Sequence, residues 1–321
     1  MSTAYAPGKS ILFGEHAVVY GRPAIAVPIR QVRAQATVQA GKTGKGVFLS
    51  APNMNWECYL TESPKGHPLR AIVMNTLSYL RVSAEPDIIV RVDSTIPIAC
   101  GLGSGTAVSV AIVRALAEYF GIQLPREAVS ELAFEVEKIH HGTPSGIDNT
   151  VIAYERPVYF VKGQTPVILI PARSFQLIVA DTGVCSPTRA VVADVRSKWE
   201  CDPRQYSSLF DEIGEVSWAA RQSIESGRTN DLGPLMNRNQ ELLRAVGVSS
   251  PELERLIEAA LQAGASGAKL SGAGRGGNMI ALVTEETAPR VEKALRASGA
   301  AHVIVTEVAS GTTDIHSADG T

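Results

Sequence analysis

The chain has 321 residues, of which 45% are hydrophobic and 19% are charged, and its formal net charge is −2. This length favours two domains over one ordinary core. Because basic residues are not in excess, a nucleic-acid partner is not expected, although a small anionic substrate could still bind at a locally basic site.

The cysteines and the apolar runs indicate in which cellular compartment the protein is expected. None of Cys58, Cys100, Cys185 and Cys201 forms a C-x-x-C pair, so a zinc site is not expected and the thiols are interpreted as reduced. The N-terminus lacks the order of a signal peptide. The longest uncharged run, between Asp93 and Arg114, is rich in small polar residues at its centre, so no membrane span is expected. These features predict a cytoplasmic protein.

Apolar periodicity predicts the elements in chain order. The first half has strands at 10–13, 24–29, 31–39, 88–92, 158–161 and 167–170, and helices at 68–82, 104–120 and 126–140. The second half has strands at 175–180, 279–283 and 302–308, and helices at 188–198, 209–226, 232–246, 251–263 and 288–297. We therefore expect an α+β protein with domains at 1–170 and 171–310 and a disordered tail at 311–321.

A glycine-rich segment, Ile-Pro-Ile-Ala-Cys-Gly-Leu-Gly-Ser-Gly-Thr at residues 96–106, opens onto the predicted helix at 104. Glycines let backbone N–H groups approach an anion, and the helix N-terminus adds unpaired donors. The hydroxyls of Ser104 and Thr106 could reach a phosphate oxygen or a metal. Thr106 breaks the dinucleotide fingerprint and Thr3 breaks the Walker A pattern. By itself the segment predicts equally a phosphate loop or a turn that only packs the helix.

Two further segments carry groups that suit phosphoryl transfer. Residues 7–21 contain Lys9, Glu15 and His16, and a lysine near phosphates can neutralise charge. Residues 135–148 place Glu137 near a helix end and Asp148 in a predicted loop. Asp148 could accept a hydroxyl proton, and Glu137 could hold Mg²⁺. A solvated lysine and a turn aspartate are the structural alternatives.

A second glycine-rich loop is predicted at residues 268–278, before the strand at 279. A flexible hairpin would explain it equally well. His140 and His141, at the end of the predicted helix that contains Glu137, are interpreted as cations at a helix C-terminus and not as metal ligands.

Taken together, segments 7–21, 96–109 and 269–277 resemble the three motifs of the GHMP kinases in order and spacing. Residues 13–21 and 141–149 are most similar to the mevalonate kinase branch, as is Asp181-Thr-Gly-Val followed by Thr188. The resemblance implies a GHMP kinase fold: an ATP-binding domain like ribosomal protein S5 domain 2 and a ferredoxin-like C-terminal domain. It also implies ATP and Mg²⁺ as cofactors and mevalonate as the alcohol phosphorylated on its 5-hydroxyl. Such kinases are often homodimers.

The resemblance also implies roles by position. Asp148 matches the catalytic aspartate, Lys9 the lysine that pairs with it, and Glu137 the Mg²⁺ glutamate. Substrate-side positions are matched by His16 and Thr188, and, with less certain roles, by Glu15 and Ser145. The ATP loops are matched by Gly101, Leu102, Gly103, Ser104, Gly105, Thr106, Gly272 and Gly274.

Two positions depart from the family pattern. Gly105 stands where a serine that can coordinate Mg²⁺ is usual, so Ser104, Thr106 or water would supply that oxygen. Arg275 stands where a glycine is more usual, and it either adds a cation near ATP or faces solvent.

Several other functions fit the same motifs. The chain could be another GHMP kinase, acting on phosphomevalonate, homoserine or a sugar. Mevalonate decarboxylases and 3-kinases are expected to lack a residue like Lys9. A non-catalytic sensor of the same fold is the rival from a different class, and the joint presence of Lys9, Glu137 and Asp148 argues against it.

Overall fold

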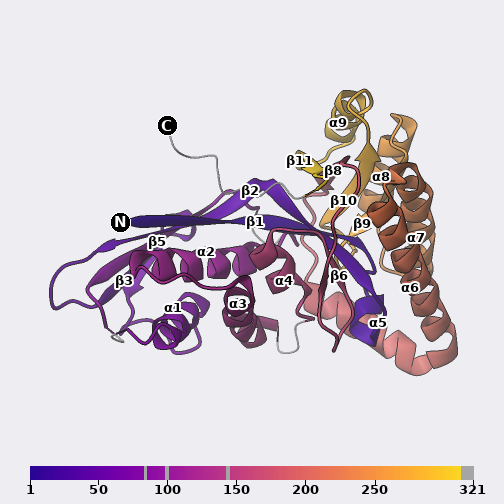
Figure 1. Ribbon diagram of the computed structural model, residues 1–321. Coiled ribbons are helices and arrows are strands. Elements are labelled where there is room, and N and C mark those ends of the chain that lie inside the picture. Colours follow the sequence, from indigo (N-terminus) through magenta and orange to yellow (C-terminus); the bar gives the residue numbers. More distant parts are fainter. Residues whose placement is uncertain (83–84, 98–100, 142–144, 312–321) are drawn as a thin grey trace. The chain divides into compact units, whose positions relative to one another are not determined.

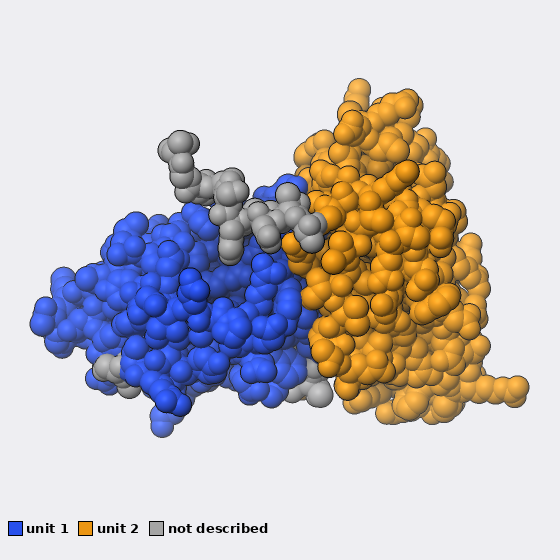
Figure 2. All heavy atoms as spheres, in the orientation of Figure 1, with its two compact units in different colours: residues 1–10, 28–155 blue, residues 11–27, 156–321 orange. Residues whose placement is uncertain are grey.

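The computed structural model describes residues 1–82, 85–97, 101–141 and 145–311. It divides into two compact units (Figure 2). Unit 1 comprises residues 1–10 and 28–155, and unit 2 comprises residues 11–27 and 156–321. The chain passes from one unit to the other three times, so the domain limits predicted from the sequence, 1–170 and 171–310, stay a prediction. Residues 312–321 of the predicted tail lie outside the described residues.

The sheet of unit 1 contains strands β1 (Ser2–Phe13), β2 (Ala24–Ala40), β3 (Val47–Ala51), β4 (Trp56–Tyr59) and β5 (Ile88–Ser94). Its order is β4-β3-β5-β2, and β1 also pairs with β2. β2 and β5 are antiparallel, with Ala34 opposite Ser94, whereas β3 and β5 are parallel. The sequence predicted two strands where β2 forms one, and it missed β3 and β4.

The helices of unit 1 are α1 (Pro68–Tyr79), α2 (Ser104–Tyr119), α3 (Arg126–His141) and α4 (Ile147–Tyr154), and they lie along one side of its sheet (Figure 1). The 3-10 turn Pro52–Met54 lies between β3 and β4 of unit 1, and a second 3-10 turn, Ala17–Tyr20, belongs to unit 2. Helix α2 is buried on nearly all sides, as a helix apolar all round must be, and this confirms the sequence prediction. Its N-terminus carries the glycine-rich segment.

Unit 2 has a four-stranded antiparallel sheet made of β8 (Phe175–Asp181), β9 (Gly267–Ser271), β10 (Asn278–Val283) and β11 (His302–Val308). Its order is β11-β8-β10-β9. The helices are α5 (Thr188–Cys201), α6 (Pro203–Ser226), α7 (Leu232–Val246), α8 (Pro251–Gln262) and α9 (Ala288–Ala297), with a 3-10 turn at Thr229–Asp231. The chain order of strand, helices, two strands, helix and strand is that of a ferredoxin-like domain, as expected.

Two short strands, β6 (Val158–Phe160) and β7 (Val167–Ile168), pair with each other, and β6 also pairs with the first residues of β2. Two sequence predictions are wrong at the site. Asp148 lies in the first turn of α4 and not in a loop. Residues 267–271 form the buried strand β9, and only the residues after Ser271 form a glycine loop. The α+β class is confirmed. Among the described residues, no helix has the length and apolar character needed to cross a membrane.

Candidate active site

Lys9 and Asp148 form an ion pair in unit 1. Lys9 Nζ lies 3.0 Å from Asp148 Oδ1. The side chain of Lys9 is 8% exposed and that of Asp148 is 30% exposed, so the lysine is buried while the carboxylate remains accessible. Lys9 belongs to β1, whose backbone is fixed here because Lys9 N donates to Leu102 O at 3.0 Å. The pair is therefore built into the junction of β1 with the segment that precedes α2.

Helix α4 orients Asp148. Gly146 begins the helix in a left-handed conformation, with φ at 88°, and Ser145 Oγ accepts a hydrogen bond from Ile147 N at 3.4 Å. Asn149 ties the same turn to α3, because its Nδ2 donates to Ser130 Oγ at 2.8 Å. The carboxylate of Asp148 thus lies at the positive end of a short helix whose start is fixed. Ser145 contributes to the helix start in this structure.

Glu137 is the second carboxylate of this cluster. It projects from the last part of α3, is 7% exposed, and accepts a hydrogen bond from Thr106 Oγ1 on α2. Burial and, second, the negative charge of Asp148 raise the pKa of Glu137 to about 8, against the opposing effects of the hydrogen bond from Thr106 and the charge of Lys9. A carboxyl group in this position holds a proton readily, or a cation in its place.

The glycines of residues 101–106 have different surroundings. Gly103, with φ at 75°, lies against the lysine stem: an added Cβ would be 2.9 Å from Ile152 Cδ1 and 3.0 Å from Lys9 Cγ. At Gly105, in the first turn of α2, an added Cβ would meet nothing within 4 Å. Gly103 is therefore required by packing, whereas Gly105 leaves open space at the helix N-terminus. The packing explanation therefore applies to Gly103, and the phosphate-loop explanation stays a prediction at Gly105.

The remaining residues of this segment also differ in their exposure and contacts. Leu102 is buried and supplies the carbonyl that binds Lys9 N. Gly101 is exposed with φ at 75°, and Ser104 is half-buried. Thr106, and not Ser104, is the residue whose hydroxyl contacts Glu137.

The donor set around Glu137 fits Mg²⁺. This ion takes one or two carboxylates together with phosphate oxygens and waters. Two carboxylates, Glu137 and Asp148, are near enough to repel each other, and a hydroxyl adjoins one of them. Within the described parts of the chain, no three His, Cys, Asp or Glu side chains gather to hold a metal. One or two carboxylates with an adjoining hydroxyl suit an ion that takes its other ligands from phosphate oxygens and water.

In unit 2, Glu15 lies in a fully buried polar cluster. Lys269 on β9 donates to Glu15 Oε1, and both side chains are 0% exposed. Lys269 Nζ also donates to Leu270 O at 2.6 Å, and Asn239 Nδ2 donates to Glu15 Oε2 at 3.2 Å. Burial raises the pKa of Glu15 and lowers that of Lys269, and the attraction between them opposes both shifts. No role was predicted for Lys269 from the sequence. Its position among small and apolar residues was the one local signal of a buried lysine.

His16 occupies a strained backbone position next to Glu15. Its φ is 61° and its ψ is −50°, and Ala17 N donates to Glu15 O across it at 2.7 Å, which makes it the centre of a γ-turn. Its Nε2 bonds Ala273 O at 2.9 Å, so Nε2 carries the proton. Burial lowers the pKa of His16 to about 4; the bond to Ala273 opposes this shift and the charge of Arg275 adds to it. His16 is therefore a neutral imidazole.

The glycine loop, residues 271–277, follows β9. Gly274 has φ at 80° and faces the carbonyl of Val248 so closely that no side chain fits. Gly272, with φ at 92°, would have nothing within 4 Å of an added Cβ. The loop is held at its end, because Gly277 N donates to Val184 O and Thr182 N donates to Gly277 O, both at 2.9 Å. Gly272 thus leaves space for a ligand, whereas Gly274 meets a packing requirement.

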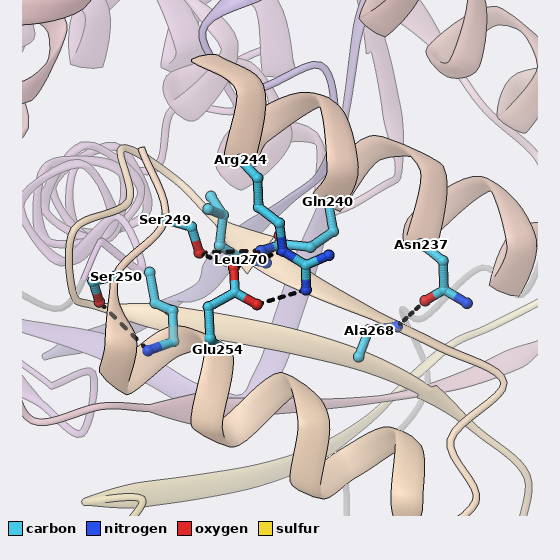
Figure 3. A network of polar contacts seen from close by, with 9 residues as sticks. Asn237, Gln240, Arg244, Ser249, Ser250, Glu254, Ala268 and Leu270 are labelled. Atoms are coloured by element: carbon cyan, nitrogen blue, oxygen red, sulfur yellow. Dashed lines mark hydrogen bonds and ion pairs between the residues drawn. The ribbon is translucent and has the colours of Figure 1, made fainter. Parts of the chain in front are cut away.

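Strand β9 is placed by α7 at its outer edge (Figure 3). Asn237 Oδ1 accepts from Ala268 N at 3.0 Å, and Gln240 Oε1 accepts from Leu270 N at 2.9 Å. Gln240 is itself held by Glu254, which also pairs with Arg244. Side-chain amides thus satisfy the edge N–H groups that another strand would otherwise bind. This network fixes the strand that leads into the glycine loop.

The predicted site residues therefore form one cluster in each unit. Unit 1 brings together Lys9, Thr106, Glu137 and Asp148, and unit 2 brings together Glu15, His16 and the glycine loop. Thr188 is exposed at the start of α5.

Comparisons with known proteins agree with this arrangement. The family model of the GHMP kinases N-terminal domain matches residues 71–156, and that of the GHMP kinases C-terminal domain matches residues 220–301. A mevalonate kinase of Thermococcus sibiricus is 34% identical over 324 residues, covering 94% of each chain. One of Aeropyrum pernix is 38% identical, covering 88% of each.

Among solved structures, that of L. major mevalonate kinase in complex with R-mevalonate is similar to this chain, with a TM-score of 0.83, 29% identity and 97% of each chain covered. These relatives span nearly the whole sequence, and both family models match it in order. The chain belongs to the GHMP kinase family.

Proposed function

We propose that this chain is a mevalonate kinase, which transfers the γ-phosphoryl group of ATP to the 5-hydroxyl of mevalonate. The names of the similar proteins support the substrate, since relatives at 34–38% identity are mevalonate kinases. The observation that carries the proposal is the Lys9–Asp148 ion pair beside the buried Glu137. A phosphoryl-transfer site needs such charged groups in fixed positions and little covalent chemistry from the protein.

In this proposal Asp148 accepts the proton of the attacking hydroxyl. Its accessible carboxylate is the only part of the pair open to a substrate, since Lys9 is buried. Lys9 holds the carboxylate in one orientation through the 3.0 Å contact, and its charge stabilises the negative charge that develops on the oxygen. The buried stem of Lys9 packs on Gly103, which keeps this geometry rigid.

ATP binding is assigned to the N-terminus of α2 and to the glycine loop. The open space at Gly105 and the unpaired N–H groups of the first helical turn suit a phosphate group. Gly272 offers similar open space in unit 2. The proposed phosphate loop also includes Gly101, Leu102, Gly103, Ser104 and Thr106. Gly274 is assigned to ATP binding with Gly272, and its lack of a side chain lets the loop pass close to Val248 O.

Glu137 and the hydroxyl of Thr106 or Ser104 would hold Mg²⁺. The ion would neutralise phosphate charge. The contact of Thr106 Oγ1 with Glu137 favours Thr106 as the hydroxyl that replaces the missing serine at position 105. On the substrate side we assign His16, Glu15, Ser145 and Thr188, with the neutral His16 acting through hydrogen bonds and not through charge.

The experiment is coupled ADP release with mevalonate, phosphomevalonate, galactose and homoserine as acceptors. Release with mevalonate alone supports the proposal. Release only with another acceptor would make the chain a different GHMP kinase. Tight mevalonate binding with no ADP from any acceptor would instead identify a non-catalytic sensor of the same fold.

A cytoplasmic location belongs to the same proposal. Cys58 and Cys201 are free thiols, which suits a reducing compartment. We propose a homodimer only because kinases of this family are often dimers. Analytical ultracentrifugation, which measures the mass of the protein in solution, would test it.

A further inference from the structure

Arg275 adopts a conformation that a glycine would adopt without strain. Its φ is 58°, and glycines flank it on both sides at positions 274, 276 and 277. A residue with a Cβ is disfavoured in the left-handed region, so an arginine kept there calls for a reason in its side chain. The family resemblance makes a glycine the usual residue at this position, which sharpens the question.

The side chain of Arg275 connects the glycine loop to two other elements. Its guanidinium forms an ion pair with Asp194 on α5, and its Nη2 also lies 3.3 Å from Gly247 O at the end of α7. Its backbone N donates to Val248 O at 2.7 Å, which fixes the residue from which the guanidinium extends. The guanidinium is thus engaged by protein acceptors and does not extend freely into solvent.

Helix α5 has few other anchors near its start. Only Val191 and Val195 are buried along its length, and residues 188–190 are exposed. The far end is better held, since Trp199 packs on Tyr20 with ring centroids 5.3 Å apart and donates to Ser207 Oγ at 3.2 Å. Within α5 itself, Asp194 provides the ion pair nearest to the start of the helix, while the segment before the helix is bound to the same loop through Gly277 N and Val184 O at 2.9 Å.

We propose that Arg275 is a positioning residue: its ion pair with Asp194 holds α5, the helix that begins at Thr188, to the glycine loop. The inference rests on the proposed function, in which Thr188 lies on the substrate side. The same loop already holds His16, through the bond of His16 Nε2 to Ala273 O at 2.9 Å. With Arg275 in place, one loop fixes both substrate-side elements of unit 2.

A second explanation is that Arg275 acts only through its charge, by attracting an anionic ligand. Replacing Asp194 distinguishes the two explanations. The attachment of α5 to the loop needs the Asp194 carboxylate, whereas an attraction of Arg275 for an anionic ligand is weakened by that carboxylate. Lys198 offers a matched control. It contacts the same carboxylate, with Nζ 3.1 Å from Asp194 Oδ2, but it lies on α5 itself and connects nothing to the loop.

The test compares Arg275→Gln, Asp194→Asn and the control Lys198→Gln, with Arg275→Lys as the conservative replacement. Amide hydrogen exchange of residues 188–195 is measured first, since it needs no substrate. We expect about two- to fivefold faster exchange in R275Q and D194N, the upper part of the range for losing a partly exposed ion pair. Exchange in K198Q should match the wild type, and R275K should recover part of the protection. Unchanged exchange in R275Q would overturn the inference.

Kinetics with mevalonate then test the consequence. The KM for mevalonate should rise about two- to fivefold in both R275Q and D194N, with a smaller change in the KM for ATP. The double variant should be no worse than either single one. A KM that rises in R275Q but falls in D194N would show that charge alone acts, and would refute the attachment. If the wild type releases no ADP with mevalonate, the proposed function fails, while the exchange experiment still decides on Arg275.

Discussion

Replacing Gly103 and Gly105 by alanine should have opposite effects on stability, although the two residues are only two positions apart. At Gly103 the new Cβ must enter the left-handed region, which costs about 1–2 kcal/mol. It must also approach Ile152 Cδ1 at 2.9 Å and Lys9 Cγ at 3.0 Å, which adds about 1–3 kcal/mol of overpacking. We expect G103A to lower the free energy of unfolding by about 2–5 kcal/mol in total.

At Gly105 the new methyl group meets nothing within 4 Å and the backbone is helical. G105A should therefore raise the free energy of unfolding by up to about 1 kcal/mol, because alanine loses less backbone entropy than glycine in a helix. Its KM for ATP should nevertheless rise, since the methyl group occupies the space assigned to phosphate. Urea unfolding and coupled ADP release measure the two effects.

Two results would refute this reasoning. If G103A unfolds at the same urea concentration as the wild type, the packing requirement at Gly103 is wrong. If G105A keeps the wild-type KM for ATP, the open space at Gly105 is not where a phosphate binds.

Three further predictions concern unit 2. Because the pKa of His16 is lowered from 6.5 to about 4, its contribution to stability is complete above pH 6.5, declines progressively as the pH falls from 6.5 to 4, and has lost about 3 kcal/mol below that pH. H16N should lack this part of the pH dependence of urea unfolding. Lys269→Met should lower the free energy of unfolding by about 3–5 kcal/mol, because it leaves the buried Glu15 without its ion-pair partner. The double variant that also carries Glu15→Leu should recover much of this free energy. If the losses of the two single variants simply add in the double variant, the two residues are not coupled. Gln240→Leu leaves Leu270 N without its acceptor and should cost about 1–3 kcal/mol, measured as a lower urea midpoint; an unchanged midpoint would contradict the edge-capping role.

The elements that the sequence predicts well are those whose pattern is local. Helix α2 is apolar on all faces over sixteen residues, and its start at Ser104 was predicted from the glycines before it. Strand β9 was missed because Lys269 interrupts its apolar run, and only Glu15, 254 positions away, explains a buried lysine there. Helix α4 was missed because it has eight residues and begins after Gly146.

The site shows the same limit. The resemblance grouped Lys9, Glu137 and Asp148, and the structure of unit 1 places the three ionisable side chains together. Which glycine faces a neighbour and which faces open space depends on side chains distant in sequence, such as Ile152 at Gly103. The role of Arg275 likewise depends on Asp194, 81 positions away, so no pattern within the glycine loop could have indicated it.

The Lys9–Asp148 pair is the centre of this account, and Asp148→Asn tests it most directly. The control is Asp93→Asn, a carboxylate of β5 that pairs with exposed Arg91. With mevalonate as acceptor, we expect D148N to lose about 10²–10⁴-fold in kcat, the range for a general base, while ATP binding measured by calorimetry stays within a few-fold of the wild type. D93N should keep its kcat. A D148N enzyme whose kcat remained within a few-fold of the wild type would contradict the assignment of Asp148 as the base.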